Sequence, residues 1–505
     1  MNGITVSDLS PDQREVYNAV VGWTEDSRGI DVMTLGGFAG SGKSTLVSLV
    51  ASTLPAPIAF CAYTGKASSV LKRKLHAAGM FTVGVQKPNR DGSASLEARP
   101  YCGTIHSLIY RMCECREPKT VQLNKPCPEK GCNMELGAPV DKLARCPKGH
   151  EHRMTAEKYD AIKPKTAFVY AEKDADGRCT KCGGKEWLRR EALDRSYSLI
   201  IVDEASMVDD MMLRDLKSYG VPILAVGDHG QLPPVGGTGS LMKNPMLRLE
   251  KIHRQAEGNP IIALSKMIRE TGRLPEDWRS LEDAEGTEAV TFGKLRFIDS
   301  ILEERYANAS PERLLAMGLA CYTNRRRMGL NVAARRALGT ARVGRELPRK
   351  GEHVVCLRNM KGNGGAPPIY NGMRGVLTTD ADFKQIKNSD GKVISTSETH
   401  IMGSVEFPDD DIEAREYEML VGQFNREKTF AQPEELAREC GIHSFAMAGA
   451  LFDFGFAMTV HKMQGSQFED LVVCVERPGP VQEEDWRRWL YTACTRASVR
   501  LTILR

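Results

Sequence analysis

The octapeptide GFAGSGKS, which runs from Gly37 to Ser44, constrains the fold of this chain more than any other segment. It matches the pattern G-x-x-x-x-G-K-[ST], follows the apolar run VMTL at 32–35, and precedes the helical run TLVSLVASTL. Glycines let backbone N–H groups wrap around phosphate groups, and the N-terminus of the following helix adds its dipole. The segment therefore predicts a strand, a phosphate-binding loop and a helix in an α/β domain.

The last residues of this loop carry side chains suited to a nucleoside triphosphate and its metal ion. Lys43 is expected to reach the β- and γ-phosphates, and the Ser44 hydroxyl is expected to bind Mg²⁺. The expected phosphate and cofactor contacts in the loop are Gly37, Gly40, Gly42, Lys43, Ser44 and Thr45.

Three further apolar runs have the composition of strands buried on both faces of a parallel sheet. They are IAFCAYT (58–64), LIIVDE (199–204) and ILAVGD (223–228). Open α/β sheets bind ligands at the C-terminal ends of their strands. Asp203 at such an end suits Mg²⁺ binding and Glu204 suits activation of water, whereas an N-cap for the next helix is the alternative.

Polar and cationic side chains elsewhere could complete this site. Gln231 lies in GDHGQLPPV (227–235), where its amide could sense a γ-phosphate or the attacking water; a simple proline-terminated turn is the alternative. Arg254 lies in LEKIHRQ and Arg496 lies in LYTACTRA. A phosphoryl-transfer site gains from a cation supplied across a cleft, although a solvated surface position is the alternative for each arginine.

The run of α/β strands is interrupted twice along the 505 residues. A Cys-rich, basic segment interrupts the first α/β unit, and a stretch with the hairpin dipeptides Asn371-Gly372 and Asp390-Gly391 interrupts the second. The expected boundaries are 1–110 and 197–246 for the first α/β domain, 111–196 for the Cys-rich insertion, 247–345 and 446–505 for the second α/β domain, and 346–445 for a small β-barrel.

Ten motifs, in order along the chain, resemble those of one enzyme family. They are LSPDQREV (9–16), GFAGSGKS (37–44), AYTGKAS (62–68), GTIHSLIY (103–110), VDEAS (202–206), GDHGQLPPV (227–235), IHRQ (252–255), CYTNRRRMGLN (321–331), FAMTVHKMQGSQ (456–467) and LYTACTRA (490–497). On these motifs the chain resembles the superfamily 1 helicases of the 5′-to-3′ branch, close to RecD-like and phage Dda-like enzymes.

The resemblance implies an ATP-dependent DNA helicase that moves 5′-to-3′ on single-stranded DNA and unwinds duplex DNA. It implies two RecA-like P-loop domains with ATP between them, Gln13 near the adenine, and Arg254 and Arg496 as cations from across the cleft. It also implies that the second insertion is an SH3-like β-barrel. The residues implied to face DNA or to couple it to ATP are Thr64, Lys66, Thr104, His106, Thr323, Asn324, Thr459, His461 and Gln464.

Aromatic residues in the same motifs have two interpretations. Tyr63, Tyr110 and Phe456 could stack on bases, or each could pack in a core. Two other functions also stay open: an ATP-driven remodeller that strips proteins from nucleic acid, and an RNA helicase of the same superfamily. Single-stranded and forked DNA are the expected partners of a monomeric enzyme, and replication or single-strand-binding proteins are further candidates.

The first insertion departs from the family because seven of the fourteen cysteines fall between 113 and 182. CPEKGC (127–132), CPKGH (146–150) and CTKCGG (179–184) have the form of zinc knuckles. One or two Zn²⁺ ions are expected, and the alternative is a set of reduced surface thiols. Bound zinc would stabilise a segment with few apolar residues, and a zinc-stabilised basic wedge that grips duplex or the displaced strand is the functional hypothesis.

The ligand pairing within this insertion stays open. One pairing joins Cys127, Cys132, Cys146 and His150, with His152 as a rival for the fourth place, and joins Cys113 and Cys115 to Cys179 and Cys182. A second pairing places Cys127, Cys132, Cys179 and Cys182 on one ion.

No apolar run reaches the roughly 18 residues of a membrane span, and the N-terminus lacks the basic and apolar regions of a signal peptide. We therefore expect a cytoplasmic protein, in a bacterium or a phage-infected cell, without a membrane partner. The net charge of +4 alone does not identify a nucleic-acid partner.

Overall fold

The structure is a computed structural model. It describes residues 5–25, 31–54, 57–77, 101–112, 119–129, 132, 134–169, 179–180, 188–190, 193, 196–234, 239, 241–251, 258–277, 279–283, 285–307, 309–341, 347–360, 367–388, 390–445 and 447–505. The chain forms two compact units: the first is Met1–Ile109, Ala192–Thr429 and Ala450–Arg505, and the second is Tyr110–Glu191 and Phe430–Gly449.

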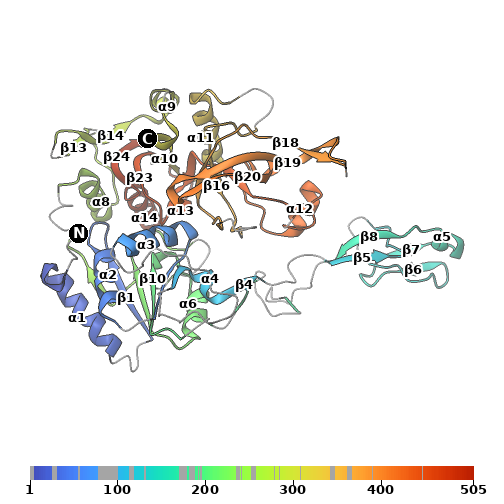
Figure 1. Ribbon diagram of the computed structural model, residues 1–505, viewed down its shortest axis with the longest axis horizontal. Helices are drawn as coiled ribbons and strands as arrows, with labels where there is room; N and C mark the ends of the chain where they lie inside the picture. The colour runs from blue at the N-terminus through green and yellow to red at the C-terminus, as the bar shows by residue number, and fades with distance from the viewer. Residues whose placement is uncertain are drawn as a thin grey trace. The chain divides into compact units, whose positions relative to one another are not determined.

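The first unit contains a parallel sheet built from the apolar runs of its N-terminal half (Figure 1). Its strands, in spatial order, are β12 (Leu247–Leu249), β1 (Val32–Gly37), β11 (Ile223–Gly227), β10 (Leu199–Asp203), β2 (Ile58–Ala62) and β3 (Tyr101–Thr104). The interior strands β2 and β11 are buried at every residue. Their nearly continuous apolar composition follows from this burial, because helices cover both faces of a parallel sheet.

The helices around this sheet are α1 (Pro11–Glu25), α2 (Lys43–Thr53), α3 (Gly65–Ala77), α4 (Ile105–Ile109) and α6 (Asp210–Lys217), with the 3₁₀ helices η1 (Val6–Asp8) and η3 (Ala205–Met207). Most of these helices follow one of the strands of the sheet, whereas α1 and η1 precede the first strand. The core between helices and sheet includes Trp23, Leu46 and Phe60. Helices α2, α3 and α4 directly follow β1, β2 and β3 at the carboxyl edge of the sheet, so that edge carries three helix N-termini.

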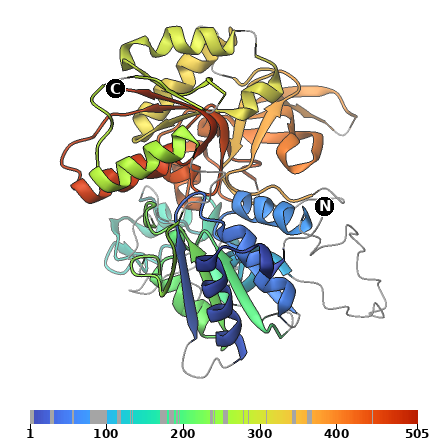
Figure 2. The ribbon, with the colours of Figure 1, turned by 90° about the vertical axis from the view of Figure 1, so that its left-hand side faces the viewer.

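A second, mostly parallel sheet lies in the C-terminal half of the same unit (Figure 2). Its strands, in spatial order, are β13 (Leu281–Glu282), β14 (Glu288–Gly293), β24 (Ala497–Leu504), β23 (Phe468–Cys474), β15 (Met317–Cys321) and β22 (Ala457–Thr459). Only the β13–β14 pair among these neighbours is antiparallel. Two parallel α/β sheets confirm the predicted two-domain α/β architecture.

The second sheet has its own helices and its own core. The helices are α8 (Pro260–Thr271), α9 (Ile298–Tyr306), α10 (Pro311–Ala316), α11 (Asn324–Ala337), α13 (Val460–Met463) and α14 (Glu483–Cys494), with the 3₁₀ helix η4 (Leu295–Phe297). Tyr306, Leu319 and Phe456 belong to the buried core. Phe456 is 1% exposed and its ring stacks on His353, so its packing interpretation is the one that fits.

An antiparallel sheet occupies the second interruption of the α/β pattern. It comprises β18 (Asp382–Lys387), β19 (Val393–Phe407), β17 (Arg374–Leu377), β16 (His353–Cys356) and β21 (Phe452–Phe454), and β20 (Ile412–Leu420) pairs with β19. The 3₁₀ helices η5 (Pro408–Asp410) and η6 (Val421–Gln423) flank β20. Asp390-Gly391 lies in the turn between β18 and β19, with Gly391 at φ 78°. The sheet takes its last strand, β21, from beyond residue 445.

The second unit consists of short two-stranded pairings. These are β4 (Tyr110–Met112) with β9 (Leu188–Arg190), β5 (Lys119–Leu123) with β8 (Lys165–Val169), and β6 (Leu143–Arg145) with β7 (Glu151–Arg153); its helices are α5 (Ala156–Asp160) and α12 (Pro433–Cys440). One small core includes Leu136, Ala144 and three cysteines. Among the described helices of the whole chain, none combines the length and the apolar character needed to cross a bilayer.

Candidate active site

The loop between β1 and α2 has the backbone of a phosphate cradle. Gly40 and Gly42 both have φ of 81°, a conformation that residues with a side chain rarely adopt. A Cβ atom on Gly37 would lie 2.6 Å from the Ser41 Oγ atom, so the loop excludes any side chain there. Lys43 Nζ donates to the carbonyl oxygens of Gly37 and Phe38, at 2.7 and 2.9 Å, and thus lies across the loop.

The acidic pair lies at the carboxyl end of β10, where Asp203 is the last residue of the strand and Glu204 follows it; β11 separates this strand from β1 in the sheet. Asp203 Oδ1 accepts a hydrogen bond from the Glu204 N–H group at 2.9 Å, and Glu204 has a left-handed backbone with φ 53°. The Glu204 side chain does not cap η3, and Asp209 caps α6 instead, so the capping alternative does not describe Glu204. Burial raises the pKa of Glu204, an effect that the nearby Arg496 guanidinium opposes.

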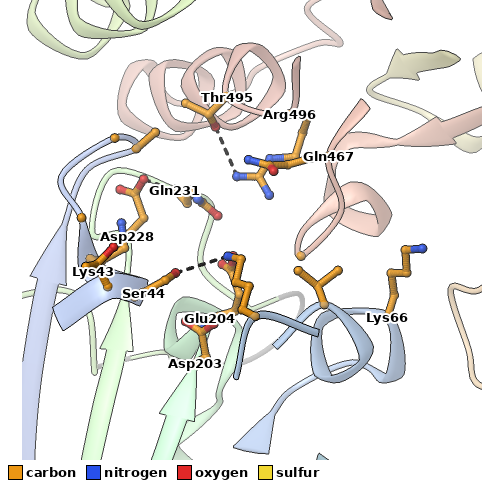
Figure 3. A pocket seen from close by; sticks show the side chains of 18 of the residues that line it. Lys43, Ser44, Lys66, Asp203, Glu204, Asp228, Gln231, Gln467, Thr495 and Arg496 are labelled. Atoms are coloured by element: carbon orange, nitrogen blue, oxygen red, sulfur yellow. Dashed lines mark hydrogen bonds between the residues drawn. The ribbon is translucent and has the colours of Figure 1, made fainter. Parts of the chain in front are cut away.

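A pocket of about 450 Å³ joins these groups to residues of the second domain (Figure 3). Its lining includes Lys43, Ser44, Thr45, Asp203 and Glu204 from the first domain. The second domain contributes Arg496 and its neighbour Thr495, with Gly465 and Gln467 from the segment after α13. The structure therefore brings most of the predicted catalytic residues to one cleft between two α/β domains.

Arg496 is fixed in this cleft by backbone contacts. It is 5% exposed, and its guanidinium donates to the carbonyl oxygens of Thr492 and Ser466, each at 3.3 Å. A buried guanidinium group needs a nearby anion, such as a carboxylate or a phosphate, to balance its charge. The three phosphates of a nucleotide would supply that charge here. Arg254, the other predicted cation, lies outside the described residues.

The turn after β11 is held from the second domain. Tyr491 on α14 donates to Asp228 Oδ2 at 2.7 Å and accepts from the Ala39 N–H group of the phosphate loop at 3.2 Å. Leu232 N–H donates to Thr492 Oγ1 at 3.0 Å, and Gln464 Nε2 donates to the Leu232 carbonyl oxygen at 2.9 Å. The phosphate loop, this turn and α14 are thereby hydrogen-bonded together.

Asp228 and Tyr491 escaped prediction from the sequence. Asp228 lies in the motif GDHGQLPPV and Tyr491 lies in the motif LYTACTRA. From the sequence alone, however, Tyr491 looks like one of several apolar residues of a buried helix. A polar side chain 263 positions away in the sequence is its partner, and no local pattern signals such a pair. Arg269 of α8 was missed for the same reason: its guanidinium lies 3.5 Å from the centre of the Phe38 ring.

The four threonines predicted to face DNA occupy equivalent places. Each lies where a parallel strand passes into a helix: Thr64 before α3, Thr104 before α4, Thr323 before α11 and Thr459 before α13. The Oγ1 atoms of Thr64, Thr104 and Thr323 accept backbone hydrogen bonds from Ala67, Ser107 and Arg326 at 3.0–3.1 Å. These helix N-termini can offer N–H groups to an anion such as a backbone phosphate.

The other predicted DNA-facing residues make contacts within the protein. Lys66 is 8% exposed and its Nζ atom lies 2.9 Å from Asp409 Oδ2 of η5, beside the nucleotide pocket. Gln464, 3% exposed, binds Leu232 as described above. His106 lies edge-on to Tyr63 and His461 lies edge-on to Tyr322. Asn324 Oδ1 accepts from Arg327 Nε at 3.2 Å.

The predicted adenine contact, Gln13, lies on α1 beside the phosphate loop. Its Nε2 atom donates to the Ser41 carbonyl oxygen at 3.3 Å, and its Oε1 atom accepts from Ser10 N–H at 3.2 Å. The side chain is 6% exposed. The structure thus ties Gln13 to the loop and does not place it among the residues that line the pocket.

The second unit holds a cluster of metal-ligand atoms. Cys127, Cys132, Cys146 and His150 present ligand atoms that all lie within 4.8 Å of one another. The Cys132 and Cys146 sulfurs are 3.9 Å apart, and His150 Nδ1 lies 3.4 Å from Cys146 Sγ. A tetrahedral Zn²⁺ at about 2.3 Å from each sulfur separates two sulfurs by about 3.8 Å. The donor set and its spacing therefore fit this ion.

The turn around Cys146 favours its thiolate, whereas burial raises the pKa of Cys127 to about 11. Gly149, at φ 81°, lets the CPKGH turn close, and the Gly149 N–H group bonds to the Cys146 carbonyl at 2.9 Å. Burial opposes ionisation of Cys146, yet backbone donors at His150 and Lys148 outweigh it and lower its pKa to about 7.

The rival ligands have different positions. His152 Nε2 lies 3.3 Å from Cys127 Sγ, adjacent to the four-ligand cluster. Cys179 is buried. Cys113, Cys115 and Cys182 lie outside the described residues, and any metal site that these three cysteines would complete lies outside them as well.

Two family models match the chain. The family described as AAA domain matches residues 25–237, and the family described as UvrD-like helicase C-terminal domain matches residues 454–504. The first match covers the strands β1 to β11 with the phosphate loop and the acidic pair, and the second covers β22 to β24 with Arg496.

Solved structures of Pif1 helicases are also similar to this chain. A Pif1 helicase from Bacteroides, in complex with ADP-AlF3 and single-stranded DNA, shares 16% sequence identity, covers 98% of this chain and 92% of its own, and gives a TM-score of 0.45. A Pif1 helicase from Candida albicans shares 16% identity, covers 98% of this chain and 95% of its own, and gives a TM-score of 0.41.

Proposed function

We propose that this chain, an ATP-hydrolysing helicase that belongs to superfamily 1, translocates 5′-to-3′ on single-stranded DNA and unwinds duplex DNA. One observation supports a motor above all others. Lys43 and Glu204 from one α/β domain line the same pocket as Arg496 from a second α/β domain. A site shared by two domains makes their relative position depend on whether the nucleotide is intact, and this dependence is what a translocating motor needs.

Each group in the pocket has a task in ATP hydrolysis. Lys43 and the loop N–H groups hold the β- and γ-phosphates, while Ser44 and Asp203 would bind Mg²⁺, which neutralises charge on the phosphate oxygens. Glu204 accepts a proton from the attacking water. Arg496 donates to the phosphate oxygens, and this contact pulls the second domain onto the first.

Single-stranded DNA is proposed to cross the carboxyl edges of both sheets. Thr64 and Thr104 lie at that edge of the first sheet, and Thr323 and Thr459 lie at that edge of the second. Hydroxyl and N–H donors at helix N-termini bind backbone phosphates without reading the sequence of bases. His106, Asn324 and His461 are proposed to extend this track. Lys66, which lines the pocket, and Gln464, which binds Leu232 in the turn after β11, are proposed to couple the track to the nucleotide.

Polarity and substrate are tested together by strand displacement. We expect the chain to unwind a duplex with a single-stranded 5′ tail and to leave one with a 3′ tail intact. We also expect single-stranded DNA to stimulate ATP hydrolysis more than RNA of the same sequence. Unwinding of only the 3′-tailed duplex would overturn the polarity. Stimulation of ATP hydrolysis by RNA alone would indicate an RNA helicase. ATP-driven displacement of bound protein without unwinding would indicate a remodeller that strips proteins from nucleic acid.

The two insertions are proposed to serve the motor. We propose that the antiparallel sheet from β16 to β21 is the SH3-like barrel of this branch of helicases. We propose that the Cys-rich insertion is the wedge that meets duplex or displaced strand at the fork. A variant without the insertion should unwind forked DNA more slowly than the full chain, whereas an equal rate would remove the wedge role.

We further propose that Cys127, Cys132, Cys146 and His150 hold one Zn²⁺ ion. The Cys146→Ser variant should then contain about one zinc equivalent less per chain than the wild-type protein, as measured by metal analysis of the purified proteins. Cys440→Ser, at a partly exposed cysteine on α12 outside the cluster, is the matched control and should keep the full zinc content. An unchanged zinc content in Cys146→Ser would remove the site.

A further inference from the structure

A buried network of hydrogen bonds crosses the cleft beside the catalytic groups. It starts at Tyr491, whose hydroxyl donates to Asp228 Oδ2 at 2.7 Å. The Asp228 carboxylate is 2% exposed, and it also accepts from the Gly230 N–H group at 2.9 Å and from Gln231 Nε2 at 3.4 Å. This network of hydrogen bonds ends at the amide of Gln231, which is 5% exposed and lines the nucleotide pocket.

The carboxylate decides how the Gln231 amide is oriented. An ionised carboxylate only accepts hydrogen bonds, so the amide must turn its NH₂ group toward Asp228 and its oxygen away. In the part of the chain that the structure describes, the Gln231 Oε1 atom has no hydrogen-bond partner although it is buried. A buried acceptor left without a donor costs free energy, and a water molecule in the pocket would satisfy it.

We propose that Tyr491 and Asp228 are positioning residues, which orient the Gln231 amide so that its Oε1 atom accepts a hydrogen bond from the attacking water. This inference rests on the proposed ATP-hydrolysing motor. Because Tyr491 belongs to α14 of the second domain and also accepts from Ala39 N–H, the orientation of Gln231 depends on the two domains being together. Water is then aligned only when the cleft is closed.

The surrounding packing shows that the hydroxyl can be removed without removing the ring. The Tyr491 ring lies edge-on to Phe38, with centroids 6.4 Å apart, and a Cβ on Gly230 would lie only 3.0 Å from it. Phenylalanine keeps these contacts and deletes only the hydrogen bonds. Burial raises the pKa of Tyr491 well above its usual value, so the hydroxyl keeps its proton and acts as a donor.

The test is a double-mutant cycle on ATP hydrolysis. Tyr491→Phe should lower kcat by about tenfold and leave the KM for ATP within about twofold, because the lost interaction acts on water alignment and not on ATP binding. In a Gln231→Ala background, Tyr491→Phe should have no further effect on kcat. An equal additional loss in that background, or an unchanged kcat in Tyr491→Phe itself, would overturn the proposal.

Two controls separate this role from others. Tyr306→Phe removes a buried hydroxyl from the core of the same domain, away from the pocket lining, and should leave kcat unchanged. A role of Tyr491 confined to holding the phosphate loop would raise KM instead of lowering kcat. All rates are also measured without DNA. A wild-type chain that hydrolyses ATP but does not respond to single-stranded DNA would count against the proposed function. The double-mutant cycle would still decide the role of Tyr491, because it depends only on ATP hydrolysis.

Discussion

Replacing Glu204 with glutamine is expected to lower kcat for ATP hydrolysis by about a thousandfold while ATP still binds with nearly wild-type affinity. The Glu204 side chain is half-buried just after β10, next to Asp203, and lines the pocket that Arg496 also lines. Glutamine has almost the same shape, so it preserves the left-handed backbone turn and the packing. It cannot accept a proton from water, and the loss therefore falls on the chemical step.

Two comparisons make the Glu204→Gln result specific. Lys43→Ala removes a phosphate contact and should lose both binding and hydrolysis. Glu483→Gln makes the same carboxylate-to-amide change at an exposed position on α14 and should change neither. Binding is measured with a fluorescent ATP analogue and hydrolysis by single turnover. Turnover at the wild-type rate in Glu204→Gln would show that another group takes the proton.

The Arg496→Ala variant is expected to lose at least about a thousandfold in kcat, the effect of removing a cation supplied across a phosphoryl-transfer site. Arg496 contributes a buried guanidinium from the second domain, and its described contacts are backbone and threonine oxygens, not carboxylates. Its charge is therefore available to phosphate oxygens. Arg496→Lys keeps the charge without the planar group of donors and should recover only a small part of the rate.

The matched control for this variant is Arg500→Ala. Arg500 lies four residues further on, on β24, and its side chain is 44% exposed beside Asp470. This change should leave kcat within about twofold of wild type, since Arg500 does not line the pocket and Asp470 keeps its ion pairs with Arg305 and Arg313. Thermal unfolding of both variants checks that the fold is intact. Hydrolysis by Arg496→Ala at a rate close to that of Arg500→Ala would mean that the nucleotide site is complete within the first domain.

Much of the fold could be predicted because the chemistry sits at the ends of strands. A strand buried on both faces shows itself as an apolar run, and the polar residue that ends it falls at the carboxyl edge of the sheet. GFAGSGKS, Asp203 and Glu204 follow this rule, and the structure places them together in one pocket. The two family matches, to an AAA domain and to a UvrD-like helicase C-terminal domain, support the expectation of an ATP-hydrolysing helicase.

What could not be predicted depends on side chains that meet across long sequence separations. Tyr491 with Asp228, and Lys66 with Asp409, pair at separations of 263 and 343 positions. Neither partner has a local pattern that indicates the other. The C-terminal boundary of the antiparallel insertion could not be predicted either. Its last strand, β21, lies in the run FDFGFAMT, and the sequence gives no sign that this run divides into β21 and β22, which belong to different sheets. Register in a sheet is set by packing that the sequence of one strand does not show.

The central claim is that ATP hydrolysis in this two-domain cleft drives strand separation. The most direct measurement is unwinding of a 5′-tailed DNA duplex by the wild-type chain and by Glu204→Gln, at saturating ATP and equal DNA occupancy. The wild-type chain should separate the strands only when ATP is present, and Glu204→Gln should bind the same DNA without separating it. Strand separation by Glu204→Gln at the wild-type rate, or none by a wild-type chain that hydrolyses ATP on this DNA, would contradict the claim.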